Sequence, residues 1–304
     1  MTRFISLLIV LLAITFLFTS TVLANDARAE EVLKQARTAA GGEDQLQKVQ
    51  TLYINGQYRR MFGERQMGGD REISIQLPNK YLVEDSSSMG GMSTAMVNTR
   101  GLNGEQAWNA NSGGGGMVIR MGGPGGQQAT PEQLEAAFRR QYRTEFARYI
   151  IAMMLTPPDS FPLVYKYAGE SDVDDAKAEV LDVTGPDNFA ARVYFDKESH
   201  LPLLISYRAR KPRMLTISRP AGGAPAATDA KKAIEDAQKK LETDTPQIPE
   251  EVDFFIRLSD HKKVNGITLP YKLTFLTESE VSEEFEIKKY QVNPQFKADK
   301  FEKH

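Results

Sequence analysis

The spacing of hydrophobic residues changes from helical to alternating about fifty residues into the chain. Between Ala27 and Ala40 the apolar residues recur at helical spacing, and Gly41-Gly42 then supplies the residue type that ends helices in a left-handed conformation. From Thr51 onward, apolar and polar residues alternate in most segments, as in half-buried strands. The pattern therefore predicts one amphipathic helix followed by a region rich in strands.

The alternating segments predict roughly a dozen strands. They cover residues 51–58, 71–77, 80–85, 93–99, 105–110, 117–121, 163–168, 177–184, 189–195, 203–208, 253–259, 267–276 and 281–292. Asn265-Gly266 between two such segments is a strong hairpin signal. Because the strands do not alternate with helices in βαβ fashion, we expect an α+β fold with a large, curved antiparallel sheet rather than a parallel one.

A second, longer helix is predicted over residues 131–155. Thr130, Pro131 and Gln133 together form a capping-box signature, and Pro157-Pro158 ends the segment. An apolar stripe runs along this helix at Leu134, Phe138, Tyr142, Phe146, Ile150, Met153 and Met154. The arginines of the helix lie largely outside that stripe, at Arg139, Arg140, Arg143 and Arg148. They predict a solvated basic face; the alternative is a surface that binds anionic lipid or acidic protein.

The N-terminus has the form of a secretory signal peptide. Arg3 precedes an almost unbroken apolar run from Phe4 to Phe18, and Val22-Leu23-Ala24 fits a cleavage site. We expect cleavage near Ala24, which would leave a soluble periplasmic protein; the alternative is an uncleaved N-terminal membrane anchor. No second apolar stretch of spanning length follows.

Composition and charge narrow the class of protein. The chain has 304 residues, 26% of them charged, and a formal net charge of -2, so we expect no nucleic-acid partner. The absence of cysteine excludes disulfides, thiolate chemistry and a lipid-modified cysteine. We expect residues 25–304 to form a single domain with a Gly-rich loop at 111–126 and a surface insertion at 220–250.

No motif of known chemistry stands out in the sequence. His200, His261 and His304 are interpreted as solvated residues of turns or of the tail, and Asp172, Asp174 and Asp175 lack the remainder of a calcium loop. Nucleophile-elbow, phosphate-loop and dinucleotide signatures are missing. We therefore expect no catalytic residues, no metal and no cofactor, with an enzyme using dispersed acidic and serine residues as the weakest alternative.

Methionine is concentrated beside glycine. Met-Gly-Gly occurs at Met67, Met89 and Met121. Unbranched thioethers adapt to apolar ligands of varied shape, so these segments are candidates for flexible, Met-rich loops around an acyl-binding pocket; ordinary packing is the simpler interpretation.

Four stretches in one order resemble a known family. They are Ala39-Ala40-Gly41-Gly42 with Leu46, Val49, Leu52 and Gly56; residues 193–203, VYFDKESHLPL; residues 264–271, VNGITLPY; and Val292-Asn293-Pro294 with Phe296 and Phe301. In these stretches the chain resembles the bacterial outer-membrane lipoprotein carrier superfamily, the LolA/LolB-like proteins, including outer-membrane lipoprotein-sorting proteins.

The resemblance implies a half-open β-barrel, a curved sheet whose concave face is covered by helices around an apolar cavity for acyl chains. We accordingly expect a periplasmic carrier or binding protein for lipid or lipoprotein cargo, with possible inner- and outer-membrane partner proteins and only transient membrane contact. The alternative is an envelope interaction or stress-sensing module that binds a protein or peptide. The candidate cavity residues are Trp108, Phe138, Tyr142, Phe146, Ile150, Met153 and Met154.

Overall fold

A computed structural model describes residues 27–63, 65–87, 96–112, 130–211 and 250–303. The expected signal peptide 1–24, most of the Gly-rich loop 111–126, the expected strand 117–121 and nearly all of the insertion 220–250 lie outside these residues. The expectations about them, and the division of the chain into a leader and one domain, stay predictions.

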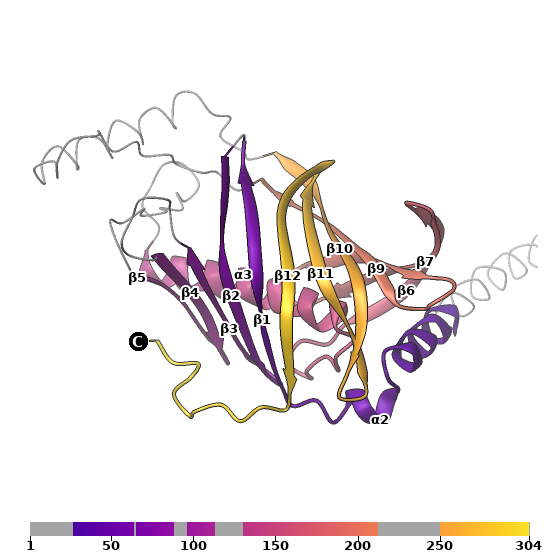
Figure 1. The fold of residues 1–304 in the computed structure, drawn as a ribbon, viewed down its shortest axis with the longest axis horizontal. Helices are drawn as coiled ribbons and strands as arrows, with labels where there is room; N and C mark the ends of the chain where they lie inside the picture. The colour runs from indigo at the N-terminus through magenta and orange to yellow at the C-terminus, as the bar shows by residue number, and fades with distance from the viewer. Residues whose placement is uncertain (1–26, 64, 88–95, 113–129, 212–249, 304) are drawn as a thin grey trace, which may run out of the picture.

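The described strands form one antiparallel sheet (Figure 1). In chain order they are β1 (Thr51–Phe62), β2 (Arg65–Gln76), β3 (Lys80–Ser87), β4 (Met96–Asn103), β5 (Gln106–Ser112), β6 (Val164–Val173), β7 (Ala176–Gly185), β8 (Phe189–Asp196), β9 (Pro202–Arg210), β10 (Glu251–Val264), β11 (Ile267–Thr277) and β12 (Glu280–Val292). The order across the sheet is β5-β4-β3-β2-β1-β12-β11-β10-β9-β8-β7-β6. Every neighbouring pair is consecutive in sequence except β12 with β1, whose pairing joins the C-terminal strand to the first one.

The sheet curves but does not close, because β5 and β6 form its two edges in the described part of the chain. This confirms the α+β class and the half-open barrel. The tightest turns follow the sequence signals: Asn265 and Gly266 both have positive φ between β10 and β11, as a two-residue hairpin of this type requires.

Three helical segments are described, two before the first strand and one that crosses a face of the sheet. Residues 27–39 form the first helix, which ends before Gly41 and Gly42, both at positive φ, and the one-turn helix α2 (Glu43–Leu46) follows. Helix α3 (Pro131–Ala152) begins with the predicted capping box, in which Thr130 and Gln133 bond to each other's backbone amides. It lies across one face of the sheet, in contact with β4 and β5 toward one edge and with β9 further along (Figure 1).

The core lies between α3, helix 27–39 and the inner face of the sheet. The apolar stripe of α3 packs against inward residues from both halves of the sheet, including Tyr81, Leu181 and Phe285. Most of the space beneath α3 is therefore filled by side chains.

Two local expectations are wrong. Met67 and its two glycines belong to β2 instead of a flexible loop, and a Cβ at Gly69 would collide with the carbonyl of Ser86 on β3, so the glycine permits close strand pairing. His261 lies within β10 rather than in a turn, because that strand continues to the Asn265-Gly266 hairpin. Met89 and Met121 lie outside the described residues.

Candidate functional site

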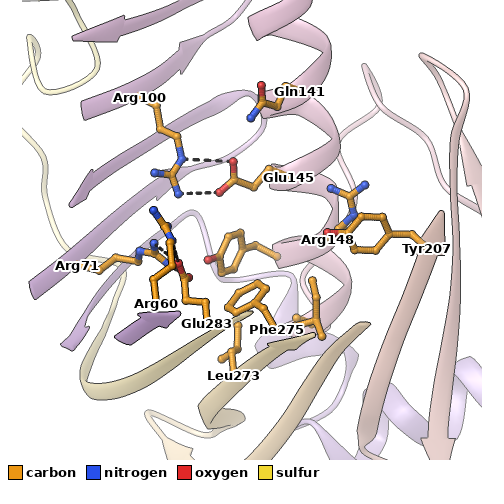
Figure 2. Close-up of a pocket in the computed structure, with 13 residues that line it drawn as sticks. Arg60, Arg71, Arg100, Gln141, Glu145, Arg148, Tyr207, Leu273, Phe275 and Glu283 are labelled. Atoms are coloured by element: carbon orange, nitrogen blue, oxygen red, sulfur yellow. Dashed lines mark hydrogen bonds and ion pairs between the residues drawn. The ribbon is translucent and has the colours of Figure 1, made fainter. Parts of the chain in front are cut away.

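A pocket of about 240 Å³ lies between α3 and the middle of the sheet (Figure 2). Helix α3 supplies one side and strands from both halves of the sheet supply the rest. The residues that line it are Arg60, Arg71, Arg100, Gln141, Glu145, Arg148, Tyr149, Ala152, Tyr207, Ile256, Leu273, Phe275 and Glu283.

The pocket side of α3 is a second stripe, next to the apolar one. Gln141, Glu145, Arg148 and Ala152 follow one another at intervals of three or four residues, which places them on one face of a helix. Tyr142, Phe146 and Ile150, one or two positions further along, face the core instead. Helix α3 therefore presents an apolar stripe to the core and a mostly polar stripe to the pocket.

The charged side of the pocket is organised around Arg71, whose side chain is 2% exposed. Its Nε and Nη2 donate to the two carboxylate oxygens of Asp85 at 2.6 and 2.9 Å, and it also binds Glu283 on β12. Bidentate pairing of this kind is the strongest geometry available to an arginine and a carboxylate. Arg60 on β1 also binds Glu283, with 2.7 Å between Nε and Oε2.

Arg100 continues the network to the helix. Its Nη1 lies 3.0 Å from Asp85, and its Nη2 lies 2.9 Å from Glu145 on α3 (Figure 2). The hydroxyl of Tyr81 donates to the same Glu145 carboxylate at 2.9 Å. A continuous chain of ion pairs thus runs from β12 through β2, β3 and β4 to α3.

The carboxylates of this network are held ionised. Burial alone would raise the pKa of Asp85, but Arg71 and Arg100 outweigh it and keep that pKa well below its ordinary value. Glu145 and Glu283 behave in the same way. Burial would raise the pKa of each, but Arg100 lowers the pKa of Glu145, and Arg71 and Arg60 lower the pKa of Glu283. These three groups therefore carry full negative charge at neutral pH.

Arg148 differs from the other three arginines of the pocket. Its guanidinium carbon lies 3.6 Å from the ring centre of Tyr207 on β9, a cation–π contact visible in Figure 2. Its Nε is buried without a hydrogen-bond partner, and no described carboxylate forms an ion pair with it. Burial accordingly lowers the pKa of Arg148.

The remaining side of the pocket is apolar. Ile256 on β10, together with Leu273 and Phe275 on β11, faces the cavity beside Ala152 of α3. Since Arg60, Arg71, Arg100 and Glu283 come from β1, β2, β4 and β12, the pocket has a charged side and an apolar side. Such a cavity suits a molecule that carries both a polar group and a hydrocarbon part.

None of the seven predicted cavity residues lines this pocket. Tyr142, Phe146, Ile150, Met153 and Met154 are each at most 5% exposed and belong to the core. Phe138 is partly buried and stacks on Tyr142 with 5.8 Å between ring centres.

Trp108, the seventh of these residues, lies on β5 and is partly buried. It faces Gly101 of β4, and its Nε1 donates to the carbonyl of Phe301 at 3.4 Å. Whether any of the seven residues contacts a ligand stays a prediction.

Of the four arginines of α3 that were predicted to form a basic face, one lies in the pocket lining instead, namely Arg148. Arg140 is exposed, and Arg139 and Arg143 are partly exposed beside Glu105, so the basic face is confirmed for these three. Arg148 instead turns inward onto Tyr207. The available signal was the polar series Gln141, Glu145 and Arg148 at helical spacing, which marks a second functional stripe, whereas the strand arginines carry no local signature.

The histidines and acidic residues form no metal site in the described part of the chain. His261 is partly buried, its Nε2 has no partner, and burial lowers its pKa. Helices long and apolar enough to cross a bilayer are likewise missing from the described ranges.

Comparison with known proteins finds solved structures of similar fold, at low sequence identity. No protein-family model matches the chain, and no curated protein matches it. The fold is similar to that of a putative outer membrane lipoprotein-sorting protein domain from Vibrio parahaemolyticus (9% identity, TM-score 0.46) and of the LolA superfamily protein NE2245 from Nitrosomonas europaea (8% identity, TM-score 0.44). A DUF1329 family protein from Desulfovibrio piger is also similar (11% identity, TM-score 0.44). Each match covers 90% of this chain and 97% of the other.

At such identities and TM-scores the likenesses carry no argument about the family or the activity of this chain. The function has to be argued from the pocket.

Proposed function

We propose that this chain is an exported, periplasmic binding or carrier protein that holds an acyl chain of a lipid or lipoprotein between α3 and the concave face of the sheet, and that it is not an enzyme. The observation that carries the proposal is the position of the pocket. It lies beneath α3, at the centre of an unclosed sheet, with Ile256, Leu273 and Phe275 on its apolar side.

The volume of the pocket indicates how an acyl chain would enter. At about 240 Å³ it is smaller than the roughly 300–1,000 Å³ of typical pockets for small molecules. An acyl chain therefore requires α3 to move away from the sheet, which would expose the apolar stripe around Phe146 and Ile150. Binding and release would then follow from the same movement, and the predicted cavity residues would contact cargo only in the open form.

The test is native mass spectrometry with lipid extraction, on protein purified from the periplasm without detergent. Phospholipid or acylated peptide bound at near-stoichiometric level supports the proposal and identifies the cargo class. Gln141→Trp should reduce the bound fraction, because Gln141 is the exposed residue of the pocket lining and a bulky ring there obstructs entry. Gln57→Trp, at an exposed site on β1 outside the lining, is the matched control.

One observation favours a second function, the binding of a protein or peptide in the cell envelope. The core beneath α3 is largely filled, and the edge strand β6 exposes Val164, which is 53% accessible. An exposed edge can accept a further strand. However, Lys166 and the irregular pairing at Gly169 are features that protect edges, so we place this function second. A protein that is free of lipid, and stays so when lipid is offered, would reverse the order.

A further inference from the structure

The charges around the pocket do not balance. Its lining contains four arginines and two carboxylates, those of Glu145 and Glu283. A third carboxylate, that of Asp85, is outside the lining but pairs with Arg71 and Arg100. Arg60, Arg71 and Arg100 each bind at least one of these carboxylates. Arg148 is left as the arginine of the lining that forms no ion pair with a described carboxylate, and its Nε has no hydrogen-bond partner.

An unpaired cation in this position is costly for the folded chain. Burying a charge is unfavourable unless it is paired and hydrogen-bonded, and an aromatic ring offers Arg148 no hydrogen-bond acceptor. Glu145, one turn earlier on α3, could have paired with it but binds Arg100 and Tyr81 instead. The arrangement leaves the donors of Arg148 available for a group that is absent from the chain itself.

Other donors lie on the same face of the helix. Gln141 is two turns before Arg148, and Tyr149 follows it; both line the pocket, and neither side chain hydrogen-bonds to a described residue. A guanidinium with nearby amide and phenol donors suits a carboxylate or phosphate, whose oxygens accept several hydrogen bonds. The apolar residues Ile256 and Leu273 line the same cavity.

We propose that the pocket binds the acidic group of an amphiphile, a carboxylate or a phosphate, with Arg148 as its counter-ion and the apolar side receiving the start of the hydrocarbon chain. This inference deepens the proposed function and rests on it for the hydrocarbon part of the ligand. It adds that the protein selects anionic over neutral amphiphiles of equal chain length.

The experiment compares three probes by isothermal titration calorimetry: dodecanoate, dodecanol and inorganic phosphate. Wild type, Arg148→Gln and the matched control Arg140→Gln are measured, Arg140 being exposed on the same helix and outside the lining. Loss of a charge-assisted contact should weaken dodecanoate binding about tenfold or more in Arg148→Gln. Dodecanoate binding to Arg140→Gln and dodecanol binding to all three proteins should be unchanged.

A stability measurement separates ligand binding from a structural role. Arg148→Gln loses the cation–π contact with Tyr207 but also removes a partly buried charge that has no ion pair, so the variant should unfold at a urea concentration close to that of wild type. A clear loss of stability together with unchanged dodecanoate affinity would assign Arg148 to packing on Tyr207 and overturn the inference.

The remaining outcomes distinguish this inference from the proposed function. If both amphiphiles bind equally well and Arg148→Gln has no effect, the anion site is wrong and the binding function stands. If phosphate binds in an Arg148-dependent manner but neither amphiphile binds, the pocket is a site for a free anion and the proposed carrier function is wrong. Absence of binding by all three probes overturns both.

Discussion

Arg71 links two strands that are far apart in sequence, and its burial makes it a sensitive residue for stability. It holds Asp85 on β3 and Glu283 on β12 while lying against the rings of Tyr58 and Phe285. Replacing it leaves two buried carboxylates without their main partner, and such a loss costs about 3–5 kcal/mol. Arg71→Met should therefore lower the free energy of unfolding, measured in urea, by about that amount.

The matched control for this change is Arg59→Met on β1. Arg59 also binds two glutamates, Glu284 and Glu286, but its side chain is 49% exposed. Exposed ion pairs contribute at most about 1 kcal/mol, so this variant should remain close to wild type. Equal losses in the two variants would contradict the assignment of the buried network.

Gly101 determines where the single tryptophan of the chain lies. The two residues are directly paired across β4 and β5, and a Cβ at Gly101 would come within 2.4 Å of the indole ring. Gly101→Ala should displace Trp108 and shift its fluorescence emission, with no other tryptophan to obscure the change. Ser112→Ala, at the exposed end of β5, should leave the spectrum unchanged; an unshifted spectrum in Gly101→Ala would mean that the ring does not lie over the glycine.

At the scale of the element, helix α3 uses two neighbouring stripes for two purposes. Ile150 belongs to the stripe that faces the core and is 1% exposed. Ile150→Glu places an unpaired charge there and should cost about 4 kcal/mol or more. Circular dichroism with urea titration should therefore show a destabilised or unfolded protein, whereas Arg140→Glu on the exposed face should retain wild-type stability. A fully folded Ile150→Glu variant would indicate that this stripe faces a cavity.

The sequence predicted α3 well because its signals are local. The capping box, the proline at the first turn and the apolar stripe each depend on residues within a few positions of one another. The same holds for the Asn265-Gly266 hairpin and for alternation in the strands. The pocket was missed because Arg60, Arg71, Arg100 and Glu283 meet through pairings of strands far apart in the chain, for which single-strand patterns contain no information.

At the scale of the whole molecule, the pairing of β1 with β12 joins the two ends of the described chain in the middle of the sheet. Asn293, at positive φ just after β12, accepts hydrogen bonds through its side chain from the amides of Gln50 and Thr51. A short motif near the C-terminus thus fixes the start of the first strand. The four sequence stretches that suggested a fold include turn and pairing residues of this kind, which determine how strands are joined and say nothing about a ligand.

The buried network also predicts how the stability of the whole molecule depends on pH. In the folded state the pKa values of Asp85, Glu145 and Glu283 lie below their ordinary values, because their arginine partners outweigh burial. The unfolded chain therefore takes up protons first as the pH falls through about 4, the ordinary carboxyl range, and stability decreases from there downward. His261, whose pKa burial lowers, acts in the same direction and begins near pH 6.5.

Comparison of variants isolates the contribution of the network from that of His261. Asp85→Asn should be several kcal/mol less stable than wild type at pH 7, because Arg71 and Arg100 lose their shared carboxylate. That difference should narrow in urea titrations between pH 5 and pH 3, because over this range the Asp85 carboxyl takes up a proton in unfolded wild type while it stays ionised in the folded state, and the variant has no such group. Asp182→Asn, which removes an exposed carboxylate paired with Arg192, is the matched control and should be nearly as stable as wild type at pH 7. A gap between Asp85→Asn and wild type that stays constant down to pH 3 would mean that Asp85 is not held ionised by its arginines, and the account of the pocket's charged side would have to be abandoned.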